Sequence, residues 1–394
     1  MYYLNEVFLM KRLFLPLLLS LLISCTNQND KNTSTINSGN SIYEEKLIVN
    51  YSSNFIIEYR DSVKIVTVLS SDSLKKVMAI YLLAGENIKT IPNILNAQLI
   101  RTPIKSVAAL TSIYIGFLEK LNLLDKVIAV DNINYIFSPL IHQKFNEGKV
   151  KEVGDANNMN IEKIFALNPG IVFTYGNGNP HLDGSEKLIK NNIPIASSTI
   201  HLETSPLARA EWIKFIAAFF DKEKEANIVF NGIEKKYNEL KLIAEKAKTR
   251  PTVFTEAIFG GTWYVPGGKS FMAALLSDAG ADYIWKKNKD VGSLKLSFEQ
   301  VYEKANSADY WINVLFWKNM EDVLKNDPRN NKFKAFKTGN IYNNNASIND
   351  KGLFEYWENG VINCDLVLSD LIKIFHPELL PDTHFKYYKK LQPK

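Results

Sequence analysis

The side chains that most often do chemistry in proteins are few in this sequence, and they are scattered. The five histidines show no spacing typical of metal ligands; they are His142, His181, His201, His376 and His384. The sequence has no Gly-x-Ser-x-Gly nucleophile elbow, no phosphate-binding P-loop and no His-Glu-x-x-His motif. We therefore expect no catalytic site, no intrinsic cofactor and no site that binds zinc or manganese directly.

Aromatic side chains suited to binding recur instead on successive expected loops, several of them beside glycines. Glycine lets a ligand approach the backbone closely, and aromatic rings in an accessible cleft suit a large, flat or semi-apolar ligand. For each ring taken alone, packing in the core is an equal alternative. The residues that we expect to contact a ligand are Tyr114, Tyr135, Tyr175, Trp263, Tyr264, Trp285, Trp317 and Trp357.

The first residues have the features of an export signal. Lys11 and Arg12 precede an apolar run over residues 13–23, which is too short to cross a bilayer comfortably. The run ends in Leu-Ile-Ser followed by Cys25, and this sequence resembles the bacterial lipobox, which implies cleavage before Cys25 and acylation of its thiol. We expect residues 1–24 to be a lipoprotein signal peptide and the polar residues 25–45 to be a flexible tether. Only Cys364 then remains, so we expect no internal disulfide.

The rest of the chain is long enough to form two domains with complete cores. The sequence has 394 residues, of which 46% are hydrophobic and 23% are charged. The net charge of +5 comes from lysines that alternate with glutamates, and no basic tract is interleaved with aromatic residues. We therefore expect no nucleic-acid partner.

The pattern of apolar residues predicts three folded segments around one connecting segment. Residues 46–99 form a β region, in which strands at 55–59 and 63–69 flank a hairpin turn at Asp61 and Ser62. From residue 100, short apolar strands alternate with helices, which predicts a mostly parallel α/β sheet. The same alternation returns after residue 249, so we expect a first lobe at 100–204 and a second lobe at 249–394.

Residues 205–248 connect the two lobes and have helical spacing of apolar residues throughout. Ser205 is a capping residue and Pro206 suits the first helical position. If the helix restarts at Asp221, its second part spans about 40 Å at 1.5 Å per residue. We expect an α/β fold in which two Rossmann-like lobes are joined by a single long α-helix, with an N-terminal β decoration. An ordinary amphipathic helix within one large domain is the alternative.

A similar motif occurs once in each expected lobe. Asn160-Ile-Glu and Ser297-Phe-Glu each place a capping residue, an apolar residue and a glutamate at the start of a short helix that leads to a buried strand. Glu162 and Glu299 therefore occupy equivalent places in the two halves. Each glutamate taken alone has a simpler interpretation, since an acidic residue in a first turn complements the helix dipole.

Taken together, these motifs resemble the substrate-binding proteins of ABC importers, in the class with a rigid helix between lobes that handles siderophores, cobalamin and haem. The resemblance covers residues 100–385 and rests on the two glutamate motifs, on Leu167-Asn-Pro and on the loop Trp263-Tyr-Val-Pro-Gly-Gly268. It implies that Glu162 and Glu299 dock on arginines of a membrane permease, which works with an ATPase. The chain departs from the family in having Gly170 after Pro169, and its β region before residue 100 lies outside the usual pattern.

The resemblance implies a metal chelate as ligand but leaves its kind open. The chain has only six arginines, and few of them adjoin the candidate loops, whereas a strongly anionic chelate needs a cluster of basic side chains. This favours cobalamin or a less charged ferric siderophore. A haem-binding protein of the same class, with a tyrosine as iron ligand, and a surface lipoprotein without a transport role are the alternatives. We expect a monomer outside the cytoplasm, anchored to a bacterial membrane through lipid on Cys25.

Overall fold

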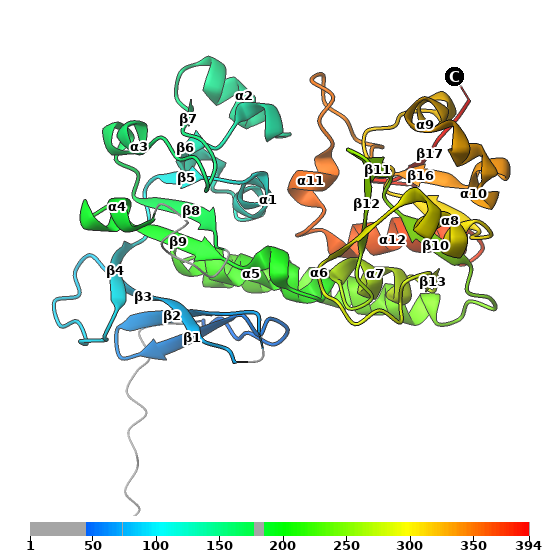
Figure 1. Ribbon diagram of the computed structural model, residues 1–394. Helices are drawn as coiled ribbons and strands as arrows, with labels where there is room; N and C mark the ends of the chain where they lie inside the picture. Colours follow the sequence, from blue (N-terminus) through cyan, green and yellow to red (C-terminus); the bar gives the residue numbers. More distant parts are fainter. Residues whose placement is uncertain (1–44, 73, 177–184, 394) are drawn as a thin grey trace, which may run out of the picture. The chain divides into compact units, whose positions relative to one another are not determined.

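The structure is a computed structural model, and it describes residues 45–72, 74–176 and 185–393. Figure 1 shows two lobes, each built on a β-sheet with helices around it, at the two ends of a pair of long helices. A further small sheet lies beneath the first lobe in that view. The mixed α/β architecture with two parallel sheets that the sequence predicts is confirmed.

The N-terminal β region is a sheet of four strands in the order β1-β2-β3-β4. The predicted hairpin is confirmed, because β1 and β2 pair in antiparallel fashion around a turn in which Asp61 adopts a left-handed φ of 51°. The last strand pairs in parallel with β3 and extends past residue 99, where we placed the end of this region. The strands are β1 (Phe55–Arg60), β2 (Val63–Leu69), β3 (Val77–Gly85) and β4 (Ala97–Thr102).

The first lobe is built on a fully parallel sheet in the order β7-β6-β5-β8-β9. Because the chain moves outward from β5 on one side and then on the other, the order reverses between β5 and β8, which is where ligands bind in such sheets. The strands are β5 (Val107–Ala109), β6 (Val127–Val130), β7 (Lys151–Glu152), β8 (Ile171–Tyr175) and β9 (Ile195–Ser198). The helices are α1 (Ser112–Lys120), α2 (Pro139–Asn146), α3 (Ile161–Leu167) and α4 (Ser185–Lys190), with 3₁₀ turns η1 (Leu124–Lys126), η2 (Ile133–Tyr135) and η3 (Ile200–Leu202).

The segment 205–248 forms two helices, with the break at Asp221 that the sequence allowed, and the second of them is the long helix between the lobes. These are α5 (Pro206–Ala218) and α6 (Glu223–Ala244), and the chain turns between them at Asp221, whose φ is 53°. The buried ammonium group of Lys64 on β2 fixes this turn, with its Nζ 2.6 Å from Asp221 Oδ1 and 2.7 Å from Glu223 Oε1. A residue with positive φ ends a right-handed helix, so the chain doubles back on itself here.

The two helices have different roles. Helix α5 is buried along almost its whole length and packs between the N-terminal sheet and the first lobe, with Phe55 on one side of Trp212 at 4.6 Å between ring centroids. Helix α6 lies against α5 and then continues into the second lobe, where the Tyr237 hydroxyl donates to Asp278 at 2.8 Å. Its 22 residues span about 33 Å at 1.5 Å per residue, so α6 alone connects the two lobes.

The second lobe has a central sheet in the order β13-β10-β15-β16-β17, parallel except for β17, and a small antiparallel sheet in the order β11-β12-β14. The order of the central sheet reverses between β10 and β15. The strands are β10 (Thr252–Thr255), β11 (Ile258–Phe259), β12 (Thr262–Pro266), β13 (Asp282–Tyr283), β14 (Ser293–Leu296), β15 (Tyr310–Ile312), β16 (Ile341–Asn343) and β17 (Lys389–Lys390). The helices are α7 (Phe271–Asp278), α8 (Phe298–Ala305), α9 (Met320–Asn326), η4 (Pro328–Lys332), α10 (Lys334–Lys337), α11 (Glu355–Asn359) and α12 (Cys364–Phe375).

The lobes also contact each other directly, through α1 of the first and α11 of the second. The side-chain amide of Asn359 donates to the carboxylate of Glu119 at 3.1 Å. Gly116 permits this approach, because a Cβ at that position would lie 2.4 Å from the carbonyl oxygen of Glu358. A larger residue at position 116 would therefore push the two helices apart.

Candidate functional site

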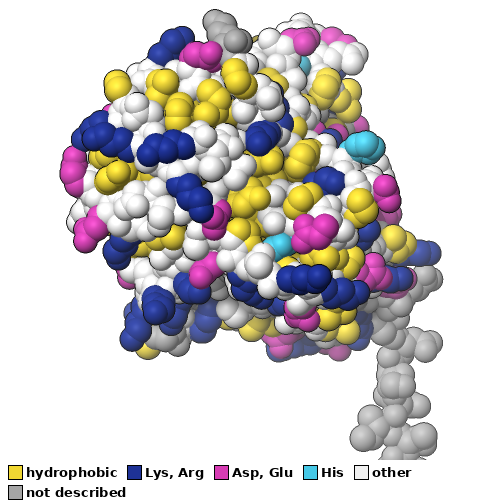
Figure 2. All heavy atoms as spheres, turned by 90° about the vertical axis from the view of Figure 1, so that its right-hand side faces the viewer, with side chains coloured by type: hydrophobic (Ala, Val, Ile, Leu, Met, Phe, Trp, Pro, Cys, Tyr) yellow, Lys and Arg dark blue, Asp and Glu magenta, His cyan; other side chains and the backbone are white. Residues whose placement is uncertain are grey.

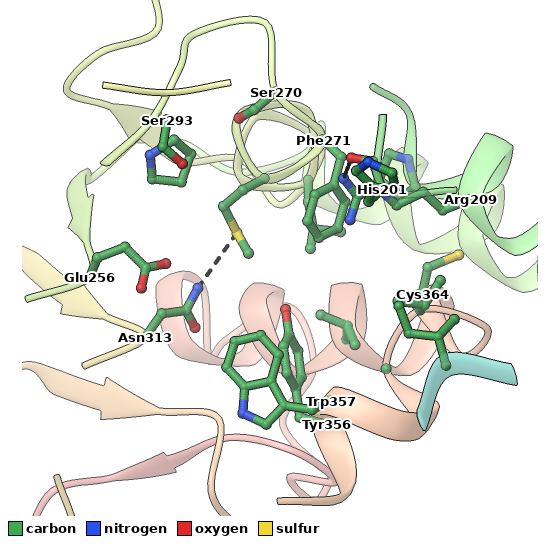
Figure 3. Close-up of a pocket in the computed structure, with 18 of the residues that line it drawn as sticks. His201, Arg209, Glu256, Ser270, Phe271, Ser293, Asn313, Tyr356, Trp357 and Cys364 are labelled. Atoms are coloured by element: carbon green, nitrogen blue, oxygen red, sulfur yellow. Dashed lines mark hydrogen bonds between the residues drawn. The ribbon is translucent and has the colours of Figure 1, made fainter. Parts of the chain in front are cut away.

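A cavity of about 350 Å³ lies at the point where the sheet order of the second lobe reverses. Its wall combines the residues that follow β10 and β15 with side chains from α5, α7, α11 and α12, and Ile113 of α1 adds a contact from the first lobe. Elements of both lobes and of the connecting segment therefore line one space (Figure 3). A cavity of this size at a topological switch point is typical of a small-molecule site.

Most of the cavity wall is apolar. Phe271, Met272 and Leu275 come from α7. Val367 comes from α12, and Val361 lies just before that helix. Such a wall releases water when a ligand with apolar surface enters, which favours binding by roughly 25 cal/mol per Å² of buried apolar area. The few polar groups among these residues then decide which ligand fits.

Glu256 is the acidic group of the cavity. It directly follows β10 and adopts a left-handed φ of 65°, which is rare for a residue with a side chain. Its backbone is fixed to β15 on both sides, since its amide donates to Ile312 O at 3.1 Å and its carbonyl accepts from Trp311 Nε1 at 2.6 Å. Burial raises the pKa of Glu256 to about 8. Backbone strain of this kind costs about 1–3 kcal/mol and concentrates at functional sites.

Asn313 occupies the equivalent place after β15, and it also has a left-handed φ, of 59°. Its amide oxygen accepts from the Tyr388 hydroxyl at 2.7 Å, and its nitrogen lies 3.7 Å from the sulfur of Met272. Figure 3 shows the side chains of Glu256 and Asn313 on the same side of the cavity. Two adjacent parallel strands thus each present one polar side chain at their carboxyl ends.

Arg209 is the basic group of the cavity, and it comes from the first turns of α5. Its guanidinium donates from Nε to Glu203 O at 3.1 Å and from Nη2 to His201 O at 2.8 Å. The same group lies 3.7 Å from the centre of the Phe271 ring, which holds it in a stacked position. Burial lowers the pKa of Arg209 to about 10, so it remains charged at neutral pH.

Three further groups that can titrate line the cavity. Burial lowers the pKa of His201, so this imidazole is neutral at pH 7. Burial raises the pKa of Tyr356 to about 12 and the pKa of Cys364 well above its ordinary value, so both stay protonated. At neutral pH the side chain of Arg209 is therefore the principal positive charge on the cavity wall.

Four of the eight aromatic residues that we expected to contact a ligand lie in the hydrophobic core instead. Trp263 is fully buried, with its Nε1 donating to Thr255 O at 3.0 Å, and it packs 5.6 Å from the Trp311 ring. The Tyr114 hydroxyl is likewise buried and bonds to Ser198 Oγ at 2.7 Å. The prediction is corrected for these four, because other side chains cover their rings; they are Tyr114, Trp263, Trp285 and Trp317.

The other four aromatic residues are accessible to different degrees. Trp357 is 52% exposed and lines the cavity, together with its neighbour Tyr356. Tyr135 and Tyr264 are exposed, and Tyr175 is half-buried with its hydroxyl accepting from the Asn157 amide at 3.3 Å. None of these three lines the described cavity, so their contact with a ligand stays a prediction.

The two glutamates of the repeated motif are both exposed at the start of short helices, α3 and α8. Asn160 and Ser297 cap these helices as the sequence indicates, and the second helix has a complete capping box. Glu299 is 2.8 Å from Arg329, and the pKa of its carboxyl is lowered, first by a hydrogen bond from its own backbone amide. Their role in docking stays a prediction, and Cys25 lies outside the described residues.

Neither the face drawn in Figure 2 nor the metal-ligating side chains of the described residues show a further concentrated site. On the face of the second lobe in Figure 2, Lys and Arg side chains are spread among acidic and hydrophobic ones. Among residues 45–72, 74–176 and 185–393, no group of three or more His, Cys, Asp or Glu side chains could hold a metal ion. Within the same ranges, no helix is long and apolar enough to cross a membrane.

Sequence reasoning missed Glu256, Asn313 and Arg209. A usable indication was present for Glu256, because it directly follows a strand that the apolar pattern predicts at 252–255, whereas Asn313 falls inside the strand predicted at 310–315. Arg209 lies within the helical pattern of residues 205–248, where a basic residue is usually solvated. Its guanidinium reaches the cavity because the start of α5 packs against α7 of the second lobe, a tertiary contact that the helical pattern does not show.

A model of the family described as periplasmic binding protein matches residues 107–346 of this sequence. The chain belongs to the periplasmic binding protein family. An uncharacterized lipoprotein of Methanocaldococcus jannaschii is 30% identical over 306 residues, which cover 74% of this chain and 70% of the relative. The family match begins at β5 and ends just after β16, so it contains the first lobe, the connecting helices and the second lobe up to β16, while α11, α12 and β17 lie beyond it.

Solved structures of other periplasmic binding proteins share this fold. An ABC-type Fe³⁺-hydroxamate transport protein from Saccharomonospora viridis is 17% identical, with a TM-score of 0.53, and the match covers 70% of this chain and 94% of that protein. The periplasmic vitamin B12 binding protein of Vibrio cholerae is 14% identical, with a TM-score of 0.50, covering 71% of this chain and 99% of that protein. At these identities the likeness concerns the fold alone.

Proposed function

We propose that this chain is the substrate-binding lipoprotein of an ABC importer, which captures a metal chelate between its two lobes and delivers it to a membrane permease. The observation that carries the proposal is the cavity at the switch point of the second lobe, whose wall includes α5 and a residue of the first lobe. A ligand in this space contacts parts of the chain that α6 holds apart. No catalytic role is part of the proposal.

The chemistry of the wall favours a ligand with extensive apolar surface and few charges. Arg209 is fixed by two backbone carbonyls and by Phe271, so its guanidinium is ready to hold one carbonyl or carboxylate oxygen of a ligand. A catecholate complex with three negative charges would need more cations than this wall supplies. We therefore favour a ferric hydroxamate or cobalamin, which are the ligand classes that two proteins of the same fold carry in their names.

Docking on the permease is proposed for Glu162 and Glu299. Both are exposed, and each stands in the first turn of a helix that its own capping residue fixes. Two carboxylates at fixed positions on separate lobes can meet two fixed basic sockets, which gives register as well as attraction. A permease that contacts both lobes at once can also distinguish conformations in which the two lobes differ in relative position.

The location outside the cytoplasm is part of the same proposal. Cys25 follows an apolar run that suits a lipoprotein signal peptide, and the relative at 30% identity is named a lipoprotein. Acylation at Cys25 would hold the protein at the membrane, close to the permease that it serves.

A binding screen tests the proposal. The purified protein is titrated with cyanocobalamin, several ferric hydroxamates, a ferric catecholate and haemin, and binding is followed by tryptophan fluorescence and by thermal shift. We expect one hydroxamate or cobalamin to bind and to raise the melting temperature, because a ligand that binds only the folded state stabilises it. If no chelate in the panel binds, the importer function is rejected.

A further inference from the structure

The carboxylate of Glu256 has no charged or hydrogen-bonding partner of its own in the described part of the chain. Figure 3 shows it directed into the cavity from the end of β10. The backbone amide and carbonyl of Glu256 are hydrogen-bonded to residues of β15. The polar side chains near its carboxylate form their hydrogen bonds with groups other than this carboxylate. Asn313 is bonded to Tyr388, and Tyr283 donates to Pro266 O.

The cations near the cavity do not neutralise this carboxylate. Arg209 is directed to the carbonyls of His201 and Glu203 and stacks on Phe271, and Figure 3 shows it on the side of the cavity opposite Glu256. His201 lies on that same side and is neutral at pH 7 because burial lowers its pKa. The other titratable groups that interact with Glu256 are phenols, namely Tyr283, Tyr356 and Tyr388.

Glu256 is half-buried, and its carboxyl group lies in a largely apolar cavity where no side chain of the described residues pairs with it. Burying a polar group without a hydrogen bond is unfavourable, and burying an ionised one is more so. The left-handed backbone at Glu256 adds strain, which two hydrogen bonds to β15 hold in place. The chain therefore spends stability to keep a fixed carboxyl group facing the ligand.

We propose that Glu256 selects the ligand by pairing with a cationic nitrogen, such as a primary ammonium group, that the chelate carries outside its metal centre. The inference rests on the proposed chelate-binding function and adds to it the charge of the ligand. The ammonium group lies at the end of the cavity formed by β10 and β15, and oxygen atoms of the chelate lie toward Arg209. A ligand with an ammonium group at one end and oxygen acceptors at the other therefore complements Glu256 on one side of the cavity and Arg209 on the other.

Two chelates that differ only by this charge test the inference. The ferric complex of desferrioxamine B carries one free primary ammonium group, and its N-acetylated derivative has an uncharged amide there. Both are titrated, by fluorescence quenching, against the wild type, Glu256→Gln and the control Glu245→Gln, whose carboxylate is exposed at the end of α6. We expect the wild type and the control to bind the ammonium form at least about tenfold more tightly than the acetylated form, since a charge-assisted hydrogen bond in a cavity supplies that much.

Glu256→Gln should remove this preference while it keeps the affinity for the acetylated form. Glutamine has the same shape, and a melting temperature of the variant that is no lower than that of the wild type shows that the fold is intact. Equal affinity of the wild type for both forms overturns the inference and leaves chelate binding in place. The inference is also overturned if another chelate of the screen binds with an affinity that Glu256→Gln does not change. If no chelate binds the wild type, the proposed function fails, and this inference fails with it.

Discussion

Glu358 of α11 accepts a hydrogen bond from the backbone amide of Phe137 at 2.7 Å, and this bond joins the second lobe to the first. Its other carboxylate oxygen is buried and finds no partner in the described part of the chain. Burial, together with the nearby carboxylates of Glu119 and Glu355, raises the pKa of Glu358 to about 8. The contact between the lobes is thus made by a carboxyl group that is mostly protonated at neutral pH.

The stability of the wild type should fall between about pH 4.5 and pH 8 through this group. A carboxyl group with a pKa raised in the folded state stabilises the protein below its unfolded pKa, and this contribution is lost as the pH rises through the folded pKa. Glu358→Gln keeps the shape without titrating. We expect the melting temperature of the variant, relative to the wild type, to rise with pH across this window and to level off above pH 8. A difference that does not change with pH would contradict the raised pKa.

Ligand affinity should depend on pH through Glu256. Burial raises its pKa to about 8, and pairing with a cation requires the ionised form, so binding below pH 8 must release a proton. We expect the affinity of the wild type for ferric desferrioxamine B to increase by up to about tenfold per pH unit between pH 6 and pH 8, and to change little above it. Glu256→Gln should give a flat profile over the same range, measured by fluorescence titration.

Arg209→Lys should weaken chelate binding by about tenfold or more, although it keeps the charge. Lysine can neither bond to the carbonyls of His201 and Glu203 in a fork nor stack on Phe271 in the same way. The control is Arg250→Lys, at an exposed arginine outside the cavity. If Arg209→Lys lowers the melting temperature but leaves the affinity of the folded protein unchanged, Arg209 is structural and does not hold the ligand.

Two tryptophans should show opposite effects when each is replaced by alanine. Trp263 is fully buried, so Trp263→Ala should cost about 3–5 kcal/mol of unfolding free energy, as core truncations of this size do. Trp357 is 52% exposed and lines the cavity, so Trp357→Ala should weaken chelate binding and change stability little. Denaturant unfolding and ligand titration of both variants separate the two roles. A loss of affinity without a loss of stability in Trp263→Ala would argue against its place in the core.

Charge reversal at the two motif glutamates should stop uptake without affecting capture of the chelate. Glu162→Lys and Glu299→Lys each place a positive charge where we propose that a permease arginine docks, and like charges repel. Uptake of labelled chelate is measured in cells that carry the chain with its own transport system, with Glu245→Lys as the matched control. Chelate affinity, measured on the purified variants, should equal that of the wild type. Normal uptake by both variants would remove these residues from the docking surface.

The sequence by itself determined the alternation of strands and helices and the positions of their caps, because these depend on local periodicity and on residues close in the chain. The hairpin at Asp61, the caps at Asn160 and Ser297, and the parallel sheets of both lobes were all predictable in this way. The turn between α5 and α6 was only partly so. Asp221 was visible as a restart, but the direction of the chain after it depends on Lys64, which is far away in the sequence.

Only the tertiary structure decided which side chains line the cavity. Trp263 and Trp357 are the same residue type on expected loops, and packing against Trp311 buries the first while the second stays exposed at the cavity. Glu256 and Arg209 are distant in the chain and carry no motif, and both line one cavity because the start of α5 packs against α7 of the second lobe. Burial and the position of a charge relative to a distant charge are properties of the packed chain, which local sequence patterns do not contain.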